Sequence, residues 1–341
     1  MSRFPYSTLV PLLTASLAVI PVAALVAATA VSTIKPVIER DFPDPAVLAV
    51  GDNYFAYSTA SGYGHQFWHV PIQRASDLSG DWTVVGDALP VLPPWSARDS
   101  HGNANVTAPE VAPRKGGGYI LYFVAQGGPK NVQCVGAALA SSPTGPFQPT
   151  PGPLVCQPGY VDSIDPQAFT DSDGKRYLLY ASGQTRTTIW LQQVTPDGLG
   201  LVGDRRALIQ ADRPDEANIV EAPSLVKHGS EYVLFYSGDT FNSGGYFVNY
   251  AISPALAGPF KKHDGQLVNR DSMGGSYPNP GGECVVVGKK HDALVFHASA
   301  GPHRRAMFVA GLSWSPLGRP TVDLDNGLTS RYSDLAAGRP D

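Results

Sequence analysis

Charged side chains are scarce in this chain, where they make up 16% of 341 residues. The 25 Lys and Arg residues form no basic run, and 29 Asp and Glu residues leave a formal net charge of −4. A nucleic-acid-binding protein normally carries a basic patch or stripe, so we exclude a nucleic acid partner. With 43% hydrophobic residues, the chain is globular and long enough to bury a large core.

A long apolar run occurs at one place only, near the N-terminus. Arg3 is followed by the mostly apolar stretch Leu9–Val26 and then by the small residues Ala28, Thr29 and Ala30. This pattern is typical of a secretory signal peptide and its cleavage site. We predict that residues 1–30 are removed and that the protein is secreted, with no membrane association after cleavage. An uncleaved membrane anchor is the alternative, although two prolines interrupt the run.

Cysteine is rare as well, with three residues and no CxxC or Cys/His spacing that would indicate a zinc site. Cys134 and Cys156 lie in two strand-like runs that a turn-rich segment joins. An antiparallel pair of strands would bring them face to face, and the oxidising environment of an exported protein lets thiols pair. We predict a Cys134–Cys156 disulfide and a free, buried thiol at Cys284.

No segment has a convincing helical period, whereas 36 glycines and 31 prolines punctuate short runs of aromatic and β-branched residues. In the stretch 163–182, an Asp-Ser-Asp-Gly turn joins two strand-like runs and predicts a β-hairpin. Similar hairpins recur along the chain at steps of 64, 57, 57 and 60 residues. Their starts are Asp44, Ala108, Asp165, Ala222 and Gly282.

The repeat predicts the architecture. Further strand candidates follow several of the hairpins, so a unit of about 60 residues has the content of one four-stranded propeller blade. Each blade buries its faces only against its neighbours, which explains why the unit is repeated. We predict an all-β fold in which residues 31–341 form a single five-bladed β-propeller. A β-sandwich is the alternative.

Acidic residues stand at the predicted starts of the inner strands, where a propeller brings its blades together around the axis. Asp44, Asp165 and Glu221 come from three different blades and would meet in one pocket. Like charges in a partly dry cleft repel one another and raise their pKa values, so such a gathering indicates chemistry rather than stability. The alternative for Asp44 and Asp165 is a turn or capping role, which is common for Asp-Pro pairs.

The motifs around these acids resemble a known family. They are FPDPAV with Asp44, APEV after Thr107, SIDPQAF with Asp165, VEAPSLV with Glu221 and VFHA with His297. In this order and at this spacing they resemble glycoside hydrolase family 43, whose members are five-bladed propellers that cut arabinose- and xylose-containing chains. The resemblance runs from about Asp41 to Val322. It therefore covers almost all of the predicted mature chain.

The resemblance implies a role for each of the three acids. Asp44 matches the general base, Glu221 the general acid, and Asp165 the residue that raises the pKa of Glu221 and orients it. Inverting cleavage needs such an acid and base roughly 6.5–9.5 Å apart, with room for a water molecule. By the same pattern Glu110 is structural, and we expect it to pair with Arg114. We expect Asp41 to be a surface acid.

The sequence departs from the family at one place. Many members carry a Pro-Gly-His segment whose His helps to hold a calcium ion in the central channel. Here the segment reads Asn279-Pro280-Gly281-Gly282-Glu283, so the expected His is absent. Oxygen ligands suit a hard cation, and Glu283 is the candidate substitute. We predict no required cofactor and leave a structural calcium open.

Four further residues are candidates for substrate binding. Sugar rings stack on aromatic faces, which points to Trp68 and Trp95, although either would serve equally well in the core. His297 ends the fifth hairpin and faces either the pocket or the core, and Arg305 matches a family arginine that reaches substrate hydroxyls. Asn105 begins a glycosylation sequon beside an inner strand.

We therefore predict a secreted enzyme that hydrolyses arabinose- or xylose-containing polysaccharides or oligosaccharides by inversion. Arabinofuranosidase or arabinanase activity is favoured over β-xylosidase activity. The partner is a carbohydrate substrate, and we expect the protein to act as a monomer. The alternatives are a carbohydrate-binding propeller without catalysis and a purely structural propeller.

Overall fold

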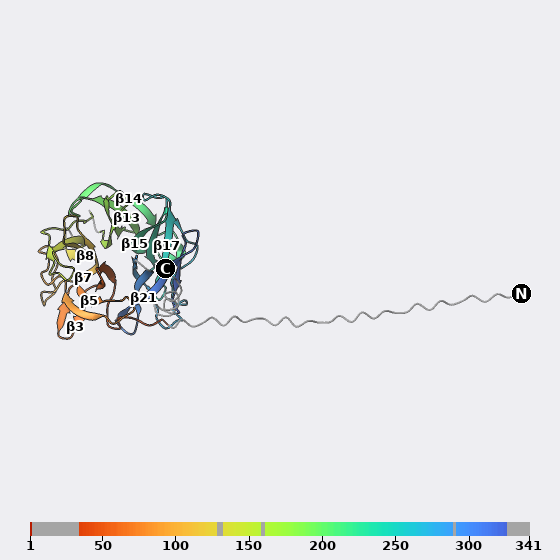
Figure 1. Cartoon of the computed structure of the whole chain (residues 1–341), viewed down its shortest axis with the longest axis horizontal. Helices are drawn as coiled ribbons and strands as arrows, with labels where there is room; N and C mark the ends of the chain where they lie inside the picture. The colour runs from red at the N-terminus through yellow and green to blue at the C-terminus, as the bar shows by residue number, and fades with distance from the viewer. Residues whose placement is uncertain (2–33, 128–131, 158–160, 289–290, 326–341) are drawn as a thin grey trace, which may run out of the picture. The chain divides into compact units, whose positions relative to one another are not determined.

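The computed structural model describes residues 1, 34–127, 132–157, 161–288 and 291–325, and the predicted signal peptide lies outside this range apart from Met1. Strands dominate these residues, and they form five four-stranded antiparallel sheets and one two-stranded sheet. The five sheets follow one another around a common axis (Figure 1). The prediction of a five-bladed β-propeller is confirmed. None of the helical segments that the structure describes is long and apolar enough to cross a membrane.

Each blade is a continuous stretch of chain. The first blade holds β1 (Ala46–Val50), β2 (Asn53–Tyr57), β5 (Pro71–Ala75) and β6 (Thr83–Asp87), and the second β7 (Val106–Pro113), β8 (Tyr119–Gly127), β9 (Val132–Ala140) and β10 (Gln148–Pro149). The third holds β11 (Ser163–Thr170), β12 (Arg176–Ser182), β13 (Thr188–Val194) and β14 (Leu201–Gln210), and the fourth β15 (Val220–His228), β16 (Glu231–Gly238), β17 (Phe247–Ser253) and β18 (Lys261–Lys262). The fifth holds β19 (Gly281–Val286), β20 (Asp292–Ser299), β21 (Arg305–Trp314) and β22 (Pro320–Asp323), while β3 (Ser61–Tyr63) and β4 (Gln66–Trp68) form a separate hairpin.

The second strand of every blade is apolar on both faces because it packs against two neighbouring blades. In β8, Leu121 and Phe123 join the cluster shared with the first blade, whereas Ile120 and Tyr122 join the cluster shared with the third. β12, β16 and β20 are divided in the same way, so five hydrophobic clusters lie between the five blades. This arrangement explains the unbroken apolar runs of these strands, which a strand with one solvated face would not show.

The start of each inner strand adopts the same unusual backbone. Five residues there have positive φ, and they are Asp44 (51°), Ala108 (46°), Asp165 (54°), Ala222 (51°) and Gly282 (60°). In four of the blades the pairing with the second strand also shifts register at this point, as a β-bulge does. The bulge turns the residues around it away from the ladder and toward the axis.

Hydrogen bonds between neighbouring blades hold four of these five residues. The N–H of Ala108 donates to Thr59 Oγ1 at 2.9 Å, and the N–H of Ala222 donates to Asp165 Oδ2 at 2.9 Å. The N–H of Gly282 donates to Ser237 Oγ at 3.0 Å, and that of Asp44 donates to His297 Nδ1 at 3.1 Å. The last bond joins the fifth blade to the first and closes the ring.

The segment before the first blade strengthens this closure. Ile38 forms an antiparallel bridge with Met307 in β21, and the N–H of Phe42 donates to the carbonyl of Arg305 at 2.8 Å. Ile38 and Phe42 are buried in the cluster between the fifth and first blades. The chain thus closes its ring by packing this segment on β21, with all four strands of each blade taken from one stretch of sequence.

The predicted disulfide is present. Cys134 in β9 is bonded to Cys156, with 4.7 Å between the two Cα atoms. Val135 and Val155 beside them form an antiparallel bridge, which is the face-to-face arrangement that the sequence indicated. Cys284 has a free thiol, but it is partly exposed at the wall of the central pocket rather than fully buried.

Replacing both Cys134 and Cys156 by alanine should lower the free energy of unfolding by about 3 kcal/mol, because the crosslink restricts a loop of about 22 residues in the unfolded chain. Urea unfolding measures the change. A reductant should destabilise the wild-type protein by a similar amount and leave the double variant unaffected. Equal sensitivity of both proteins to the reductant would contradict the pairing.

Candidate active site

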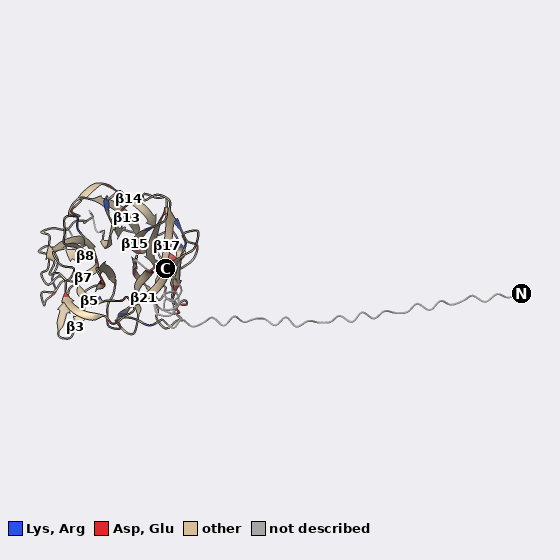
Figure 2. Cartoon of the chain, viewed as in Figure 1, with Lys and Arg blue, Asp and Glu red and all other residues tan. Residues whose placement is uncertain are grey.

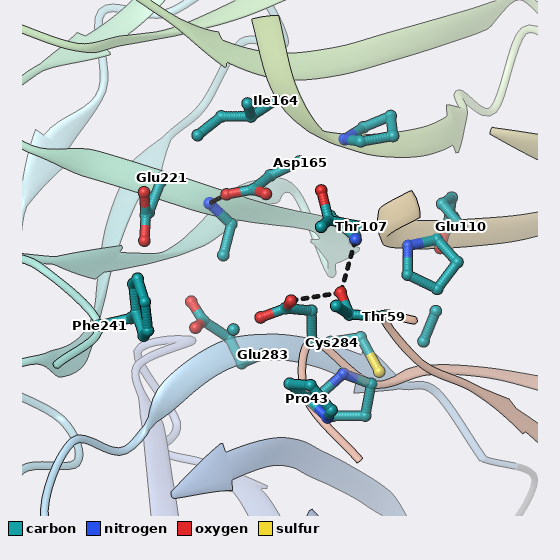
Figure 3. Close-up of a pocket in the computed structure, with 18 of the residues that line it drawn as sticks. Pro43, Thr59, Thr107, Glu110, Ile164, Asp165, Glu221, Phe241, Glu283 and Cys284 are labelled. Carbon is teal, nitrogen blue, oxygen red and sulfur yellow. Dashed lines mark hydrogen bonds between the residues drawn. The ribbon is translucent and has the colours of Figure 1, made fainter. Parts of the chain in front are cut away.

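A cavity of about 460 Å³ lies where the five inner strands begin. Carboxyl groups from all five blades line it, and they are Asp44, Glu110, Asp165, Glu221 and Glu283. Asp41, just before the first blade, adds a sixth. Figure 3 shows Glu221 and Asp165 on one side of the cavity, and Glu283 and Thr59 across from them. Charged residues are otherwise thinly spread over the blades (Figure 2).

Asp44 is held as a carboxylate by two donors. Thr59 Oγ1 donates to Oδ2 at 2.5 Å, and Arg305 Nη1 donates to Oδ1 at 3.1 Å. Burial acts to raise the pKa of Asp44, but the charge of Arg305, the neighbouring His297 and the Thr59 hydrogen bond together hold the pKa below its ordinary value. Asp44 is therefore ionised across the neutral range and is fit to accept a proton.

His297 supports Asp44 through the backbone. Its Nδ1 accepts the N–H of Asp44, so in this arrangement the proton of the neutral imidazole is on Nε2. Burial and the charge of Arg305 lower the pKa of His297 to about 3. The contact of 3.4 Å between His297 Nδ1 and Asp44 Oδ1 is thus no ion pair. His297 positions the carboxylate without adding charge.

Glu221 lies in the opposite electrostatic environment. Burial and the neighbouring carboxyl of Asp165 raise its pKa well above the ordinary value. One hydrogen bond is made to it, from Tyr246 Oη to Oε1 at 2.8 Å, and this acts weakly in the other direction. Glu221 therefore keeps its proton near neutral pH and is fit to donate it.

Asp165 stands between these two groups. Its Oδ2 accepts the N–H of Ala222, the residue after Glu221, so it is tied to the strand that carries Glu221. Burial and the charge of Asp44 raise the pKa of Asp165 to about 7. Its charge, when present, favours the protonated form of Glu221.

The remaining two carboxyl groups are also buried. Glu110 accepts the N–H of Ala168 in the third blade at 3.2 Å, while Arg114 lies against the carbonyl of Asp197, so the expected Glu110–Arg114 pair is not formed. Burial raises the pKa values of Glu110 and Glu283 to about 8. Within the described residues no group of three or more His, Cys, Asp or Glu side chains is arranged to hold a metal ion.

A comparison with known protein families shows which family this chain belongs to. The model of "Glycosyl hydrolases family 43" matches residues 33–322. The chain belongs to glycosyl hydrolase family 43. It is a glycoside hydrolase, as the resemblance of its motifs indicated.

Known members resemble this family 43 chain along most of its length. It is 25% identical to a probable arabinan endo-1,5-α-L-arabinosidase B of Aspergillus fumigatus, over 74% of this chain and 77% of that protein. It is 24% identical to the extracellular endo-α-(1→5)-L-arabinanase 1 of Bacillus subtilis, over 75% of this chain and 79% of that protein. The crystal structure of a thermostable family 43 glycoside hydrolase superposes with a TM-score of 0.71 and 23% identity, over 86% of this chain and 95% of that one.

The predicted substrate-binding residues of this hydrolase separate into two groups. Arg305 lines the cavity, whereas His297 is buried outside its lining and accepts the N–H of Asp44. Trp68 and Trp95 do not line it. Trp68 stacks on Tyr63 in the β3–β4 hairpin, with 4.1 Å between ring centroids, and Trp95 packs on the core beside Phe123. The structure brings neither indole to the acids.

Three residues of the family 43 site escape the sequence analysis. Asp41 is not a surface acid, because it lines the cavity and accepts hydrogen bonds from Ser61 Oγ and the N–H of Arg305. Phe241 is 44% exposed at the cavity, and the Arg305 guanidinium lies 4.9 Å from its ring centroid. Tyr246 holds Glu221. Phe241 and Tyr246 lie outside the repeated hairpin, so only the folded chain reveals them.

Two glycines leave space for the rings of Tyr246, which donates to Glu221, and His297, which accepts the N–H of Asp44. A Cβ on Gly281 would lie 2.0 Å from the ring of Tyr246, and one on Gly282 would lie 2.5 Å from the ring of His297. Tyr246 and His297 are themselves stacked, with 6.0 Å between centroids. The two rings that contact Glu221 and Asp44 therefore pack together against the glycines at the start of β19.

Gly281→Ala should therefore reduce hydrolysis at least tenfold and lower the free energy of unfolding by about 1–3 kcal/mol, because the new methyl group displaces Tyr246 from Glu221. Steady-state kinetics and urea unfolding measure the two effects. Gly62→Ala is the matched control, since a Cβ there meets nothing within 4 Å. Wild-type behaviour of Gly281→Ala in both assays would refute the packing argument.

Proposed function

We propose that this protein is an exported, arabinan-active glycosidase that cleaves by inversion, with Asp44 as general base and Glu221 as general acid. The observation that carries the proposal is the opposite protonation of two carboxyl groups in one cavity. Arg305 and Thr59 keep Asp44 ionised, while burial and Asp165 keep Glu221 protonated. Two carboxyl groups with pKa values driven apart are what acid and base catalysis of glycoside cleavage requires.

In the proposed reaction, Asp44 removes a proton from a water molecule that attacks the anomeric carbon. Glu221 gives its proton to the oxygen of the leaving group on the other side of the sugar. Asp165 keeps Glu221 protonated until transfer and is tied to the same strand through Ala222. Arg305 neutralises part of the charge of Asp44. Phe241, exposed beside Arg305, offers an apolar face for a sugar ring.

The choice of arabinan rests on the relatives. Two of them are named as arabinan-cleaving enzymes and match three quarters of this chain. One of these is named as extracellular, which supports export together with the leader-like N-terminal sequence. These similarities support the proposed substrate class and location, and the arrangement of the cavity supports the proposed acid and base roles.

Side-by-side assays of linear arabinan, nitrophenyl α-L-arabinofuranoside and nitrophenyl β-D-xyloside test this proposal. We expect hydrolysis of an arabinose-containing substrate with inverted configuration of the released sugar, which NMR detects. Glu221→Gln and Asp44→Asn should each lower kcat by at least a hundredfold on natural arabinan while leaving the unfolding curve close to wild type. Glu39→Gln, at an exposed acid, is the control and should be fully active. A retained anomer, or full turnover by Glu221→Gln, would disprove the mechanism.

The pH profile should be bell-shaped. Activity needs ionised Asp44 and protonated Glu221, so it rises as pH passes the lowered pKa of Asp44 and falls as pH passes the raised pKa of Glu221. Asp165→Asn removes a charge that raises the pKa of Glu221, so the alkaline limb of kcat/KM should move to lower pH. An alkaline limb that stays in place or moves upward would exclude this role of Asp165.

A further inference from the structure

Glu283 occupies a position that the other blades give to proline. The residue after the left-handed position is Pro45, Pro109, Pro166 and Pro223 in the first four blades, and Glu283 in the fifth. The fifth blade thus places a carboxyl group where its counterparts place an apolar ring. Replacing a proline in a repeated bulge by a buried acid gains nothing for packing, because a carboxyl group loses its hydration there.

The hydrogen bonds of Glu283 leave one of its oxygens free. Its Oε2 accepts a hydrogen bond from Ser237 Oγ at 2.6 Å. The Ser237 hydroxyl is the donor in this bond, and its oxygen accepts the N–H of Gly282 at 3.0 Å. Oε1 is buried and has no hydrogen-bond partner among the residues that the structure describes. The side chain is 5% exposed and lines the cavity.

Glu283 lies among the residues that line the cavity. Figure 3 shows the carboxyl group of Glu283 in the cavity between Phe241 and Thr59, across from Glu221. Thr59 donates to Asp44, and Glu283 lines the same cavity as both. Burial favours its neutral form, with the pKa raised to about 8. Since Oε2 accepts from Ser237, the proton of the neutral form is on Oε1.

We propose that Glu283 recognises the substrate by a hydrogen bond between its free Oε1 and one hydroxyl group of the sugar that lies between Asp44 and Glu221. The proposal rests on the function proposed above. A buried polar atom without a partner is costly, and a substrate hydroxyl that satisfies it is bound selectively, because an analogue without that hydroxyl leaves the atom unpaired. Glu283 is thus a specificity-determining residue and takes no part in the proton transfers.

Two variants of Glu283 separate recognition from a structural role. Glu283→Ala should raise KM for nitrophenyl α-L-arabinofuranoside about tenfold and change kcat much less, as loss of one hydrogen bond to a bound sugar predicts. Glu283→Gln should restore KM to within about threefold of wild type, because its amide oxygen accepts from Ser237 and its NH₂ group donates from the place of Oε1.

Monodeoxy analogues of the arabinofuranoside complete the test. One of them should lower kcat/KM of the wild-type enzyme about tenfold and leave Glu283→Ala unaffected, because that variant has already lost the contact. Glu39→Gln should behave as wild type throughout. An unchanged KM in Glu283→Ala, or equal losses with every analogue in both enzymes, overturns the proposal. If the wild-type enzyme hydrolyses neither these arabinofuranosides nor linear arabinan, the proposed function fails and the role of Glu283 fails with it.

Discussion

The left-handed residue at the start of each inner strand is the constraint on which the rest of the structure depends. A residue other than glycine pays of order 1–3 kcal/mol for this conformation and keeps it only where the surroundings enforce it. Here hydrogen bonds from the neighbouring blade provide that enforcement at Asp44, Ala108 and Ala222. The same bonds join blade to blade around the axis. The backbone that forms the site and the contacts that close the ring are therefore one feature.

The bulge also determines which side chains reach the axis. Asp44 and Asp165 occupy the left-handed position itself, where aspartate is better tolerated than most residues. Glu221 stands one residue earlier, and its longer side chain enters the cavity from the strand that Asp165 holds through Ala222. A repeated backbone thus presents three carboxyl groups in three different environments. Their pKa values differ because their neighbours differ, not because their backbones do.

The repeat in the sequence was sufficient to predict the five blades and the acids at the starts of their inner strands. Asp-Pro and Ala-Pro pairs mark the left-handed position in the first four blades, and all five inner strands begin within two residues of their predicted starts. Asp41, Phe241 and Tyr246 lie on connecting segments that have no counterpart elsewhere in the chain. Their place in the cavity depends on how those segments fold back. For Trp68 and Trp95 the sequence offers an aromatic ring but no sign of what it packs against, and the structure places both against other aromatic rings.

The fifth blade departs most from the repeat, and its departures are related to one another. Glycines at 281 and 282 accept Tyr246 and His297 at distances that no side chain would allow, and these two rings hold the acid and the base. Once the strand approaches those rings so closely, Ser237 and the N–H of Gly282 are also brought together, and Ser237 is left with one proton to give to Glu283. The loss of proline at position 283 therefore belongs to the same local design. A proline at position 283 would serve packing alone. The fifth blade instead accommodates the rings that contact Asp44 and Glu221, and it places the carboxyl group of Glu283 in the same cavity.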